Sequence, residues 1–98
     1  MIGFDIAENC VKQYIDDFLE LPPLENEKEF IHVCNMQWAA EDLLRYLKEF
    51  WNEDFIWELI SNYVDDARYR AEKYKDDQMG IVYKTAKETA QEIMLYFV

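Results

Sequence analysis

The sequence predicts an all-α protein, an antiparallel bundle of about four helices in a single domain. Apolar residues recur every three or four positions along almost the whole chain, which is the period of an amphipathic helix. No segment of useful length alternates apolar and polar residues as a strand would, and the 98 residues include only two glycines and two prolines. Because these two residue types interrupt helices most effectively, their scarcity favours long helices joined by short turns.

We expect the first helix over residues 5–20. Asp5 followed by Glu8 resembles a capping box, with Asp in the position usually held by Ser or Thr. Pro22-Pro23 is expected to end this helix, because proline lacks the backbone amide that would continue its hydrogen bonds. The predicted buried face consists of Phe4, Ala7, Val11, Tyr14, Ile15 and Phe18.

The second helix is predicted over residues 26–51, with Asn26 as its N-cap and Glu29 as the reciprocal capping residue. Asn52 and the two acids that follow it predict a new start, so the third helix is expected over residues 53–76. The predicted buried face of the second helix is Val33, Met36, Ala40, Leu43, Leu44, Leu47 and Trp51. That of the third helix is Ile56, Leu59, Ile60, Tyr63, Val64, Ala67, Ala71 and Tyr74.

The last helix is predicted over residues 79–97. Asp76-Asp77 and Gly80 indicate the break that precedes it, because acids and glycine are typical of turns. Its predicted buried face is Met79, Tyr83, Ala86, Ala90, Ile93, Met94 and Phe97.

The net charge of −11 is unevenly distributed along the chain. Residues 1–66 carry sixteen acids and four bases, whereas residues 67–98 carry five acids and six bases. A field of this kind attracts basic partners and repels both nucleic acid and anionic membranes. The expected partner is therefore a basic protein, with no direct contact to nucleic acid or membrane.

The compartment that the sequence favours is the cytoplasm. The first ten residues carry Asp5 and Glu8 where an export signal has basic residues. The longest uncharged run, residues 30–40, is shorter than the roughly 20 residues that span a bilayer. Cys10 and Cys34 are too few for a disulfide framework, so we expect reduced thiols.

Metal sites find little support in the sequence. Glu29-x-x-His32 resembles half of a di-iron motif, but the chain has one histidine, so the second such pair is missing. A zinc site built from Cys10, His32 and Cys34 would lack a fourth ligand and the usual close Cys pair. We expect no metal and no other cofactor.

Catalytic residues are also hard to find. Ser61 is the only serine, and no glutamate has an acid three residues onward, the spacing by which helical nucleotide pyrophosphatases hold magnesium. Acid pairs four residues apart remain as possible magnesium ligands, although they also fit solvated helix faces. These pairs are Glu25/Glu29, Glu49/Glu53, Asp54/Glu58 and Glu88/Glu92. We therefore predict no enzyme, with a magnesium-dependent nucleotide hydrolase as an alternative.

Several apolar residues lie outside the predicted buried faces. Ile31, Cys34 and Trp38 form a second stripe on the second helix, and Tyr69 lies opposite the buried face of the third. The stripe fits either a helix packed on both sides or a contact patch anchored by Trp38. A further aromatic cluster around Asn52 is interpreted as the apolar cap of one bundle end. It consists of Phe50, Trp51, Phe55 and Trp57.

The acids of the second and third helices are the strongest functional signal. If the chain folds back at Asn52, eight carboxylates occupy roughly 20 Å of helix, or one per about 2.5 Å. Duplex DNA carries one charge per about 1.7 Å, so the array could replace phosphates on a nucleic-acid-binding surface. It equally fits a coat that promotes solubility. The eight residues are Glu41, Asp42, Glu49, Glu53, Asp54, Glu58, Asp65 and Asp66.

We hypothesise a non-enzymatic, stoichiometric inhibitor of a basic nucleic-acid-binding protein, of the kind that phages direct against host restriction or CRISPR systems. The carboxylates would engage Lys and Arg of the target, while Ile31, Trp38 and Tyr69 would supply apolar contacts. An immunity protein for a basic toxin is one alternative, and a structural homo-oligomer built through the Ile31/Cys34/Trp38 stripe is another. The small basic strip Arg68, Arg70, Lys73 and Lys75 could bind anions or the acidic array of a second copy.

Overall fold

The protein is an all-α four-helix bundle. The computed structural model describes residues 3–19 and 26–97, and no strand occurs in that part of the chain. The four predicted helices are present, with bounds within a few residues of those expected, and short 3-10 turns precede α3 and follow α4. The elements are α1 (Phe4–Leu19), α2 (Glu27–Glu49), η1 (Glu53–Phe55), α3 (Ile56–Lys73), α4 (Gln78–Met94) and η2 (Leu95–Phe97).

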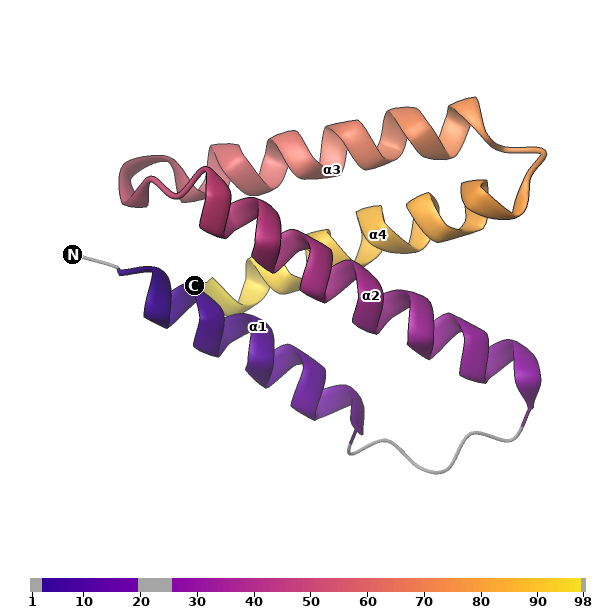
Figure 1. Ribbon diagram of the computed structural model, residues 1–98, viewed down its shortest axis with the longest axis horizontal. Helices are drawn as coiled ribbons and strands as arrows, with labels where there is room; N and C mark the ends of the chain where they lie inside the picture. The colour runs from indigo at the N-terminus through magenta and orange to yellow at the C-terminus, as the bar shows by residue number, and fades with distance from the viewer. Residues whose placement is uncertain (1–2, 20–25, 98) are drawn as a thin grey trace.

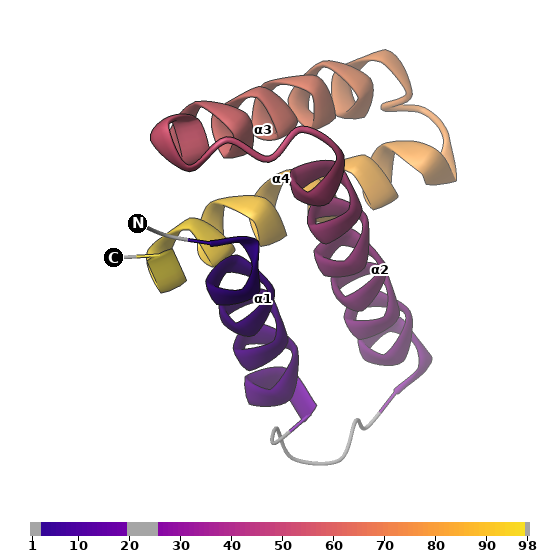
Figure 2. The same cartoon turned by 60° about the vertical axis from the view of Figure 1, so that its left-hand side comes forward.

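The helices form two antiparallel hairpins that lie across each other. Helices α1 and α2 make one hairpin, and α3 and α4 make the other (Figures 1 and 2). Helix α4 packs against both α3 and α2, so that α2 and α3 diverge from the corner that joins them. The end of α4 returns to α1, where the Cys10 thiol donates a 3.3 Å hydrogen bond to the Tyr96 carbonyl.

Short polar side chains begin three of the elements. The Asn26 side chain accepts a hydrogen bond from the Glu29 amide at 2.9 Å, and Asn52 accepts one from the Asp54 amide at 3.0 Å. Asp77 does the same for the Met79 amide at 3.1 Å. The two starts predicted at Asn26 and Asn52 are thus confirmed, because these caps satisfy amides that have no partner within the helix.

The start of α1 differs from the prediction. The helix begins at Phe4, where the Ile6 amide bonds to the Gly3 carbonyl at 3.1 Å. Asp5 therefore lies within the first turn and is not the N-cap, although its charge still suits the positive end of the helix dipole. The predicted helix end at Pro22-Pro23 lies outside the described residues.

The predicted faces of the four helices supply the core. Most of the expected residues are buried or half-buried, and the main cluster joins all four helices. Met79 and Tyr74 are exceptions and stay exposed, because they lie at the helix ends next to the turn that joins α3 to α4. The main cluster contains Val11, Tyr14, Met36, Ala40, Leu43, Leu47, Ile56, Ile60, Val64, Ala90 and Ile93.

A second, smaller cluster lies where α2, α3 and α4 approach one another. It consists of the buried alanines Ala39, Ala67 and Ala86, with the Tyr63 ring packed against them. Because alanine side chains are small, the three helix backbones can come close at this point. Beyond it, towards their N-termini, α2 and α4 separate (Figure 1).

Three tyrosine–carboxylate hydrogen bonds tie the helices together. Tyr14 donates to Glu92 at 2.7 Å, Tyr63 to Asp42 at 2.8 Å, and Tyr96 to Asp17 at 2.5 Å. Burial, and then the hydrogen bond to the carboxylate, raise the pKa of Tyr14 and of Tyr63 above the usual value of 10.0. At neutral pH these hydroxyls are therefore held as donors.

Candidate functional site

The eight predicted carboxylates do not form one continuous array, because α2 and α3 diverge. Asp42, Glu49 and Asp66 line a polar groove of about 480 Å³ between the two helices, together with Arg45 and Arg70. The other acids are spread from α2 to α3. Glu41 faces the α1 side of α2, Glu53 and Asp54 lie on η1, Glu58 lies in the first turn of α3, and Asp65 lies further along it.

Three of the eight carboxylates have basic partners within the chain. Asp42 pairs with Arg45 at 3.0 Å, Asp65 with Arg68 at 3.6 Å, and Asp66 with Arg70 at 3.1 Å. Exposed pairs of this kind contribute little to stability. Their consequence is electrostatic, because each paired arginine cancels charge that a basic partner would otherwise meet.

The remaining five acids have no basic partner among the described residues. Glu41, Glu49, Glu53, Asp54 and Glu58 make no ion pair with any residue that the structure describes. Four of them fall within residues 49–58, a segment with no Lys or Arg. Of the eight predicted carboxylates, the unpaired ones are thus concentrated where α2 meets α3, at one end of the molecule (Figure 1).

Exposed aromatic rings occupy the same segment, which we call the acid–aromatic corner (residues 49–58). Phe50, Phe55 and Trp57 are 53%, 53% and 45% exposed. Only Trp51 turns inward, where its ring meets that of Phe4 edge-on at 5.6 Å. The interpretation of this cluster as an apolar cap is therefore right for Trp51 and wrong for the other three residues.

The local backbone explains why these rings face solvent. Helix α2 stops at Glu49, and the Phe50 amide still bonds to the Tyr46 carbonyl at 3.1 Å. The Asn52 cap then begins η1, and α3 follows with Ile56 as its first buried residue. Since neighbouring residues of a helix are about 100° apart, Phe55 and Trp57 cannot share the inward direction of Ile56.

The chemistry of the corner suits a partner that is both basic and partly apolar. Four carboxylates can pair with Lys or Arg, and exposed aromatic faces attract the same cations through their π-electrons. Aromatic side chains also dominate the energetic centres of protein interfaces. Periodicity alone does not show that Phe50, Phe55 and Trp57 stay uncovered, because it does not show how the chain passes from α2 to α3.

The three apolar residues predicted to contact a partner are exposed but lie apart. Ile31 lines a groove between α2 and α4, whereas Trp38 lines a separate hollow of about 460 Å³ between α1 and α2, near Glu41. Tyr69 is exposed on α3, and Cys34 is exposed on α2. No single surface that includes all of them is formed.

The basic strip on α3 is largely paired within the chain. Arg68 and Arg70 make ion pairs with acids of α3, and Lys75, in the turn after that helix, pairs with Glu72 on it. The hydrogen bond to the Tyr83 hydroxyl, followed by the charge of Asp66, raises the pKa of Arg70. Lys73 lies over the Tyr74 ring at 5.4 Å. Little positive charge remains to attract anions or the corner of a second copy.

The candidate zinc ligands are dispersed. Cys10 bonds to the Tyr96 carbonyl beside η2, His32 lines the groove between α2 and α4, and Cys34 is exposed. Within residues 3–19 and 26–97, no three His, Cys, Asp or Glu side chains lie close enough together to hold a metal ion. None of the helices described is long and apolar enough to cross a bilayer.

Comparison of the chain with protein-family models, curated proteins and solved structures found no match in any of the three.

Proposed function

We propose that the protein is a stoichiometric inhibitor that binds a basic nucleic-acid-binding protein through the acid–aromatic corner. Inhibitors of this type act for phages against host restriction or CRISPR systems. One observation carries the proposal. Glu49, Glu53, Asp54 and Glu58 have no basic partner in the described chain, and they alternate along the chain with aromatic residues that the bundle leaves exposed.

The two kinds of side chain have separate roles in this proposal. The carboxylates take the place of phosphates on the Lys and Arg residues of the target, which speeds encounter and fixes the orientation of the complex. Phe50, Phe55 and Trp57 provide the apolar area whose removal from water holds the complex together. Neither role requires a conformational change of the bundle.

The cytoplasm is the compartment in which we place this encounter. Cys10 and Cys34 are free thiols in the structure, which suits a reducing environment. Restriction and CRISPR enzymes act in the same compartment. The corner is also a poor site for nucleic acid itself, because its four carboxylates would repel phosphates.

A binding panel of restriction and CRISPR nucleases, measured at rising salt with and without competing duplex DNA, tests the proposal. We expect an affinity that falls as salt rises, and loss of binding when the DNA site is occupied. The variant Glu49→Gln/Glu53→Gln/Glu58→Gln should bind at least about tenfold more weakly and with a shallower salt dependence.

A matched control changes the net charge by the same amount at other places. It consists of Asp16→Asn, Asp76→Asn and Glu88→Gln, three acids that make no ion pair with a described residue and lie on α1, on the turn after α3 and on α4. Its affinity should stay close to that of the natural chain. If both variants weakened binding equally, the net charge of the whole protein, and not the corner, would account for the attraction. An affinity that does not change with salt concentration would contradict the replacement of phosphates by carboxylates.

A further inference from the structure

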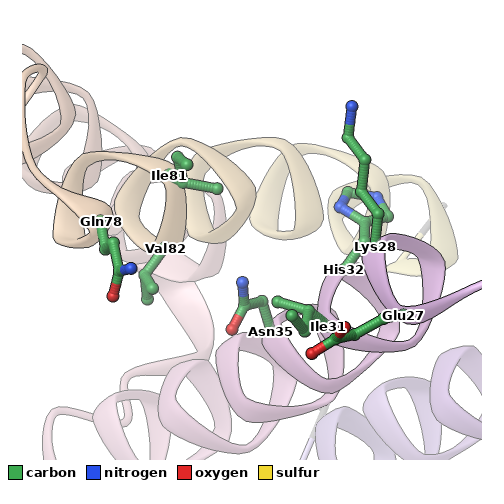
Figure 3. A pocket seen from close by; sticks show the side chains of 8 residues that line it. All are labelled: Glu27, Lys28, Ile31, His32, Asn35, Gln78, Ile81 and Val82. Carbon is green, nitrogen blue, oxygen red and sulfur yellow. The ribbon is translucent and has the colours of Figure 1, made fainter.

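A second surface lies at the opposite end of α2 from the corner. A groove of about 640 Å³ runs between the N-terminal parts of α2 and α4, on the side where the two helices have separated (Figure 3). Helices α2 and α4 are in close contact at Ala39 and Ala86, and the groove lies beyond that contact, towards the N-termini of the two helices. Its lining residues are Glu27, Lys28, Ile31, His32, Asn35, Gln78, Ile81 and Val82.

Large apolar side chains are exposed in and beside the groove. Ile31 and Ile81, one from each side, are 49% and 62% exposed. Phe30 and Met79, their neighbours on the same two helices, are exposed as well. Apolar residues gathered beside a hollow in this way are typical of a surface that another molecule covers.

We propose that a second copy of this chain covers the groove, so that the protein associates with itself through the N-terminal parts of α2 and α4. Charge is the reason for choosing this occupant. The lining residues include one acid, Glu27, and one base, Lys28, so the groove attracts neither a basic nor an acidic partner by net charge. In a chain of charge −11, two copies can approach each other best where the local charge balances.

The surface also has the features of a two-fold interface. In such an interface the same patch occurs on both partners, so a hollow must lie beside a projection that can enter it. The groove supplies the hollow, and Phe30, which is exposed next to Ile31 and does not line the groove, is the apolar side chain that would enter the hollow of the other copy. A rim that carries both Glu27 and Lys28 can pair with its own copy, acid against base.

The expected association is weak. A tight interface uses about 20–30 residues on each side and buries about 800 Å² per partner, whereas eight residues line this groove. Dissociation constants in the micromolar range or higher follow. The interface leaves the acid–aromatic corner free, because residues 31 and 49 of α2 are about 27 Å apart along the helix at 1.5 Å per residue.

Sedimentation equilibrium from about 10 µM to about 1 mM tests the proposal, because self-association follows mass action. The apparent mass should rise from 11.9 kDa towards twice that value. Raising the salt should strengthen association, because it screens the repulsion between two acidic chains. The corner behaves in the opposite way, since salt should weaken its binding to a basic target, so the two proposals can fail independently.

Two matched lysine variants locate the interface. Ile81→Lys places a charge in the groove and should raise the midpoint concentration at least about tenfold. Leu95→Lys, at an apolar residue that is also largely exposed and lies beyond the other end of α4, should not change it. Circular dichroism checks that both variants keep the helical content of the natural chain.

Three results would overturn the proposal. The first is a natural chain that stays at 11.9 kDa throughout the concentration range. The second is an Ile81→Lys variant that associates like the natural chain, which would move the interface elsewhere. The third is a monomer whose groove amides are protected from hydrogen exchange only when a basic target is added, which would assign the groove to that target.

Discussion

The Tyr63 hydroxyl on α3 donates a 2.8 Å hydrogen bond to the Asp42 carboxylate on α2, and Arg45 holds the same carboxylate at 3.0 Å. This arrangement joins the two helices that diverge from the corner. Asp42, one of the eight carboxylates predicted to bind a partner, is thus already bonded within the chain. Asp42 is therefore better understood as a structural residue than as part of the binding surface.

Tyr63→Phe should destabilise the fold by about 1.5 kcal/mol, the lower end of the range for a hydrogen bond to a charged group, because Arg45 still pairs with Asp42. Urea unfolding at pH 7 measures the change. Tyr69→Phe is the matched control, because Tyr69 is exposed on the same helix. Equal costs for the two variants would show that the hydrogen bond contributes nothing.

The same variant should change the response to alkaline pH. The pKa of Tyr63 is raised in the folded protein, so above the usual value of 10.0 the unfolded chain loses this proton first. The stabilising contribution is complete below pH 10 and falls as the pH rises above it. The natural chain should therefore lose stability between pH 9.5 and 11 more steeply than Tyr63→Phe, as unfolding midpoints across that range would show.

Asp17 should affect stability in acid. Its hydrogen bonds from Tyr96 and then from Gln13 lower the pKa of this carboxyl below the usual 3.8. The stabilising contribution is present above pH 3.8 and is lost as the pH falls below it. Unfolding midpoints between pH 5 and 2.5 should fall less steeply for Asp17→Asn than for the natural chain. Asp16→Asn, next to it on the solvent side of α1, should follow the natural chain.

Gly80→Ala should destabilise the protein, although alanine is normally the better residue in a helix by about 1 kcal/mol. A Cβ at this position would overlap the Tyr74 carbonyl oxygen in the turn between α3 and α4. We expect a net cost of about 1–3 kcal/mol, as for other overpacked sites.

The matched change is Gly3→Ala, where a Cβ meets no atom within 4 Å. It should leave the unfolding free energy within about 0.5 kcal/mol of the natural chain. A stabilising effect of Gly80→Ala would mean that the turn moves aside easily and that helix propensity decides the outcome.

Trp57→Ala should weaken binding to the proposed basic target by roughly 10–100-fold, as expected for an aromatic residue at the centre of an interface. The fold should be unaffected, because Trp57 is exposed. Isothermal titration calorimetry measures the affinity, and Met79→Ala is a control at a similarly exposed apolar residue on another helix. A loss no greater than that of the control would remove the aromatic contribution from the proposed function.

The sequence predicted the helices well because the signals for them are local. Asn26 and Asn52 cap the elements that follow them, and the apolar period identifies most of the buried face of every helix. The tyrosine–carboxylate bonds could not be predicted in the same way. Tyr14 and Glu92, for example, are 78 residues apart, and only the crossing of the hairpins brings them together.

The candidate site was predicted only in part, for a related reason. Periodicity shows which side of a helix is apolar but not which neighbour covers it, so Ile31 and Trp38 share a stripe and yet line different hollows. The acids near Asn52 were recognised by composition alone. The exposure of Phe55 and Trp57 follows from their angular offset from Ile56, whereas that of Phe50 depends on where α2 ends, which periodicity does not show.

The placement of the groove and the corner at opposite ends of α2 has a consequence for affinity. Two chains joined at their grooves would each keep a corner free. A target that is itself a symmetric dimer could then be held at two points, provided that its two sites match the spacing. Simultaneous engagement raises the overall affinity by as much as about 10²–10⁴ without any new contact. A weak interaction at each single site could in that way give tight binding of the dimeric target.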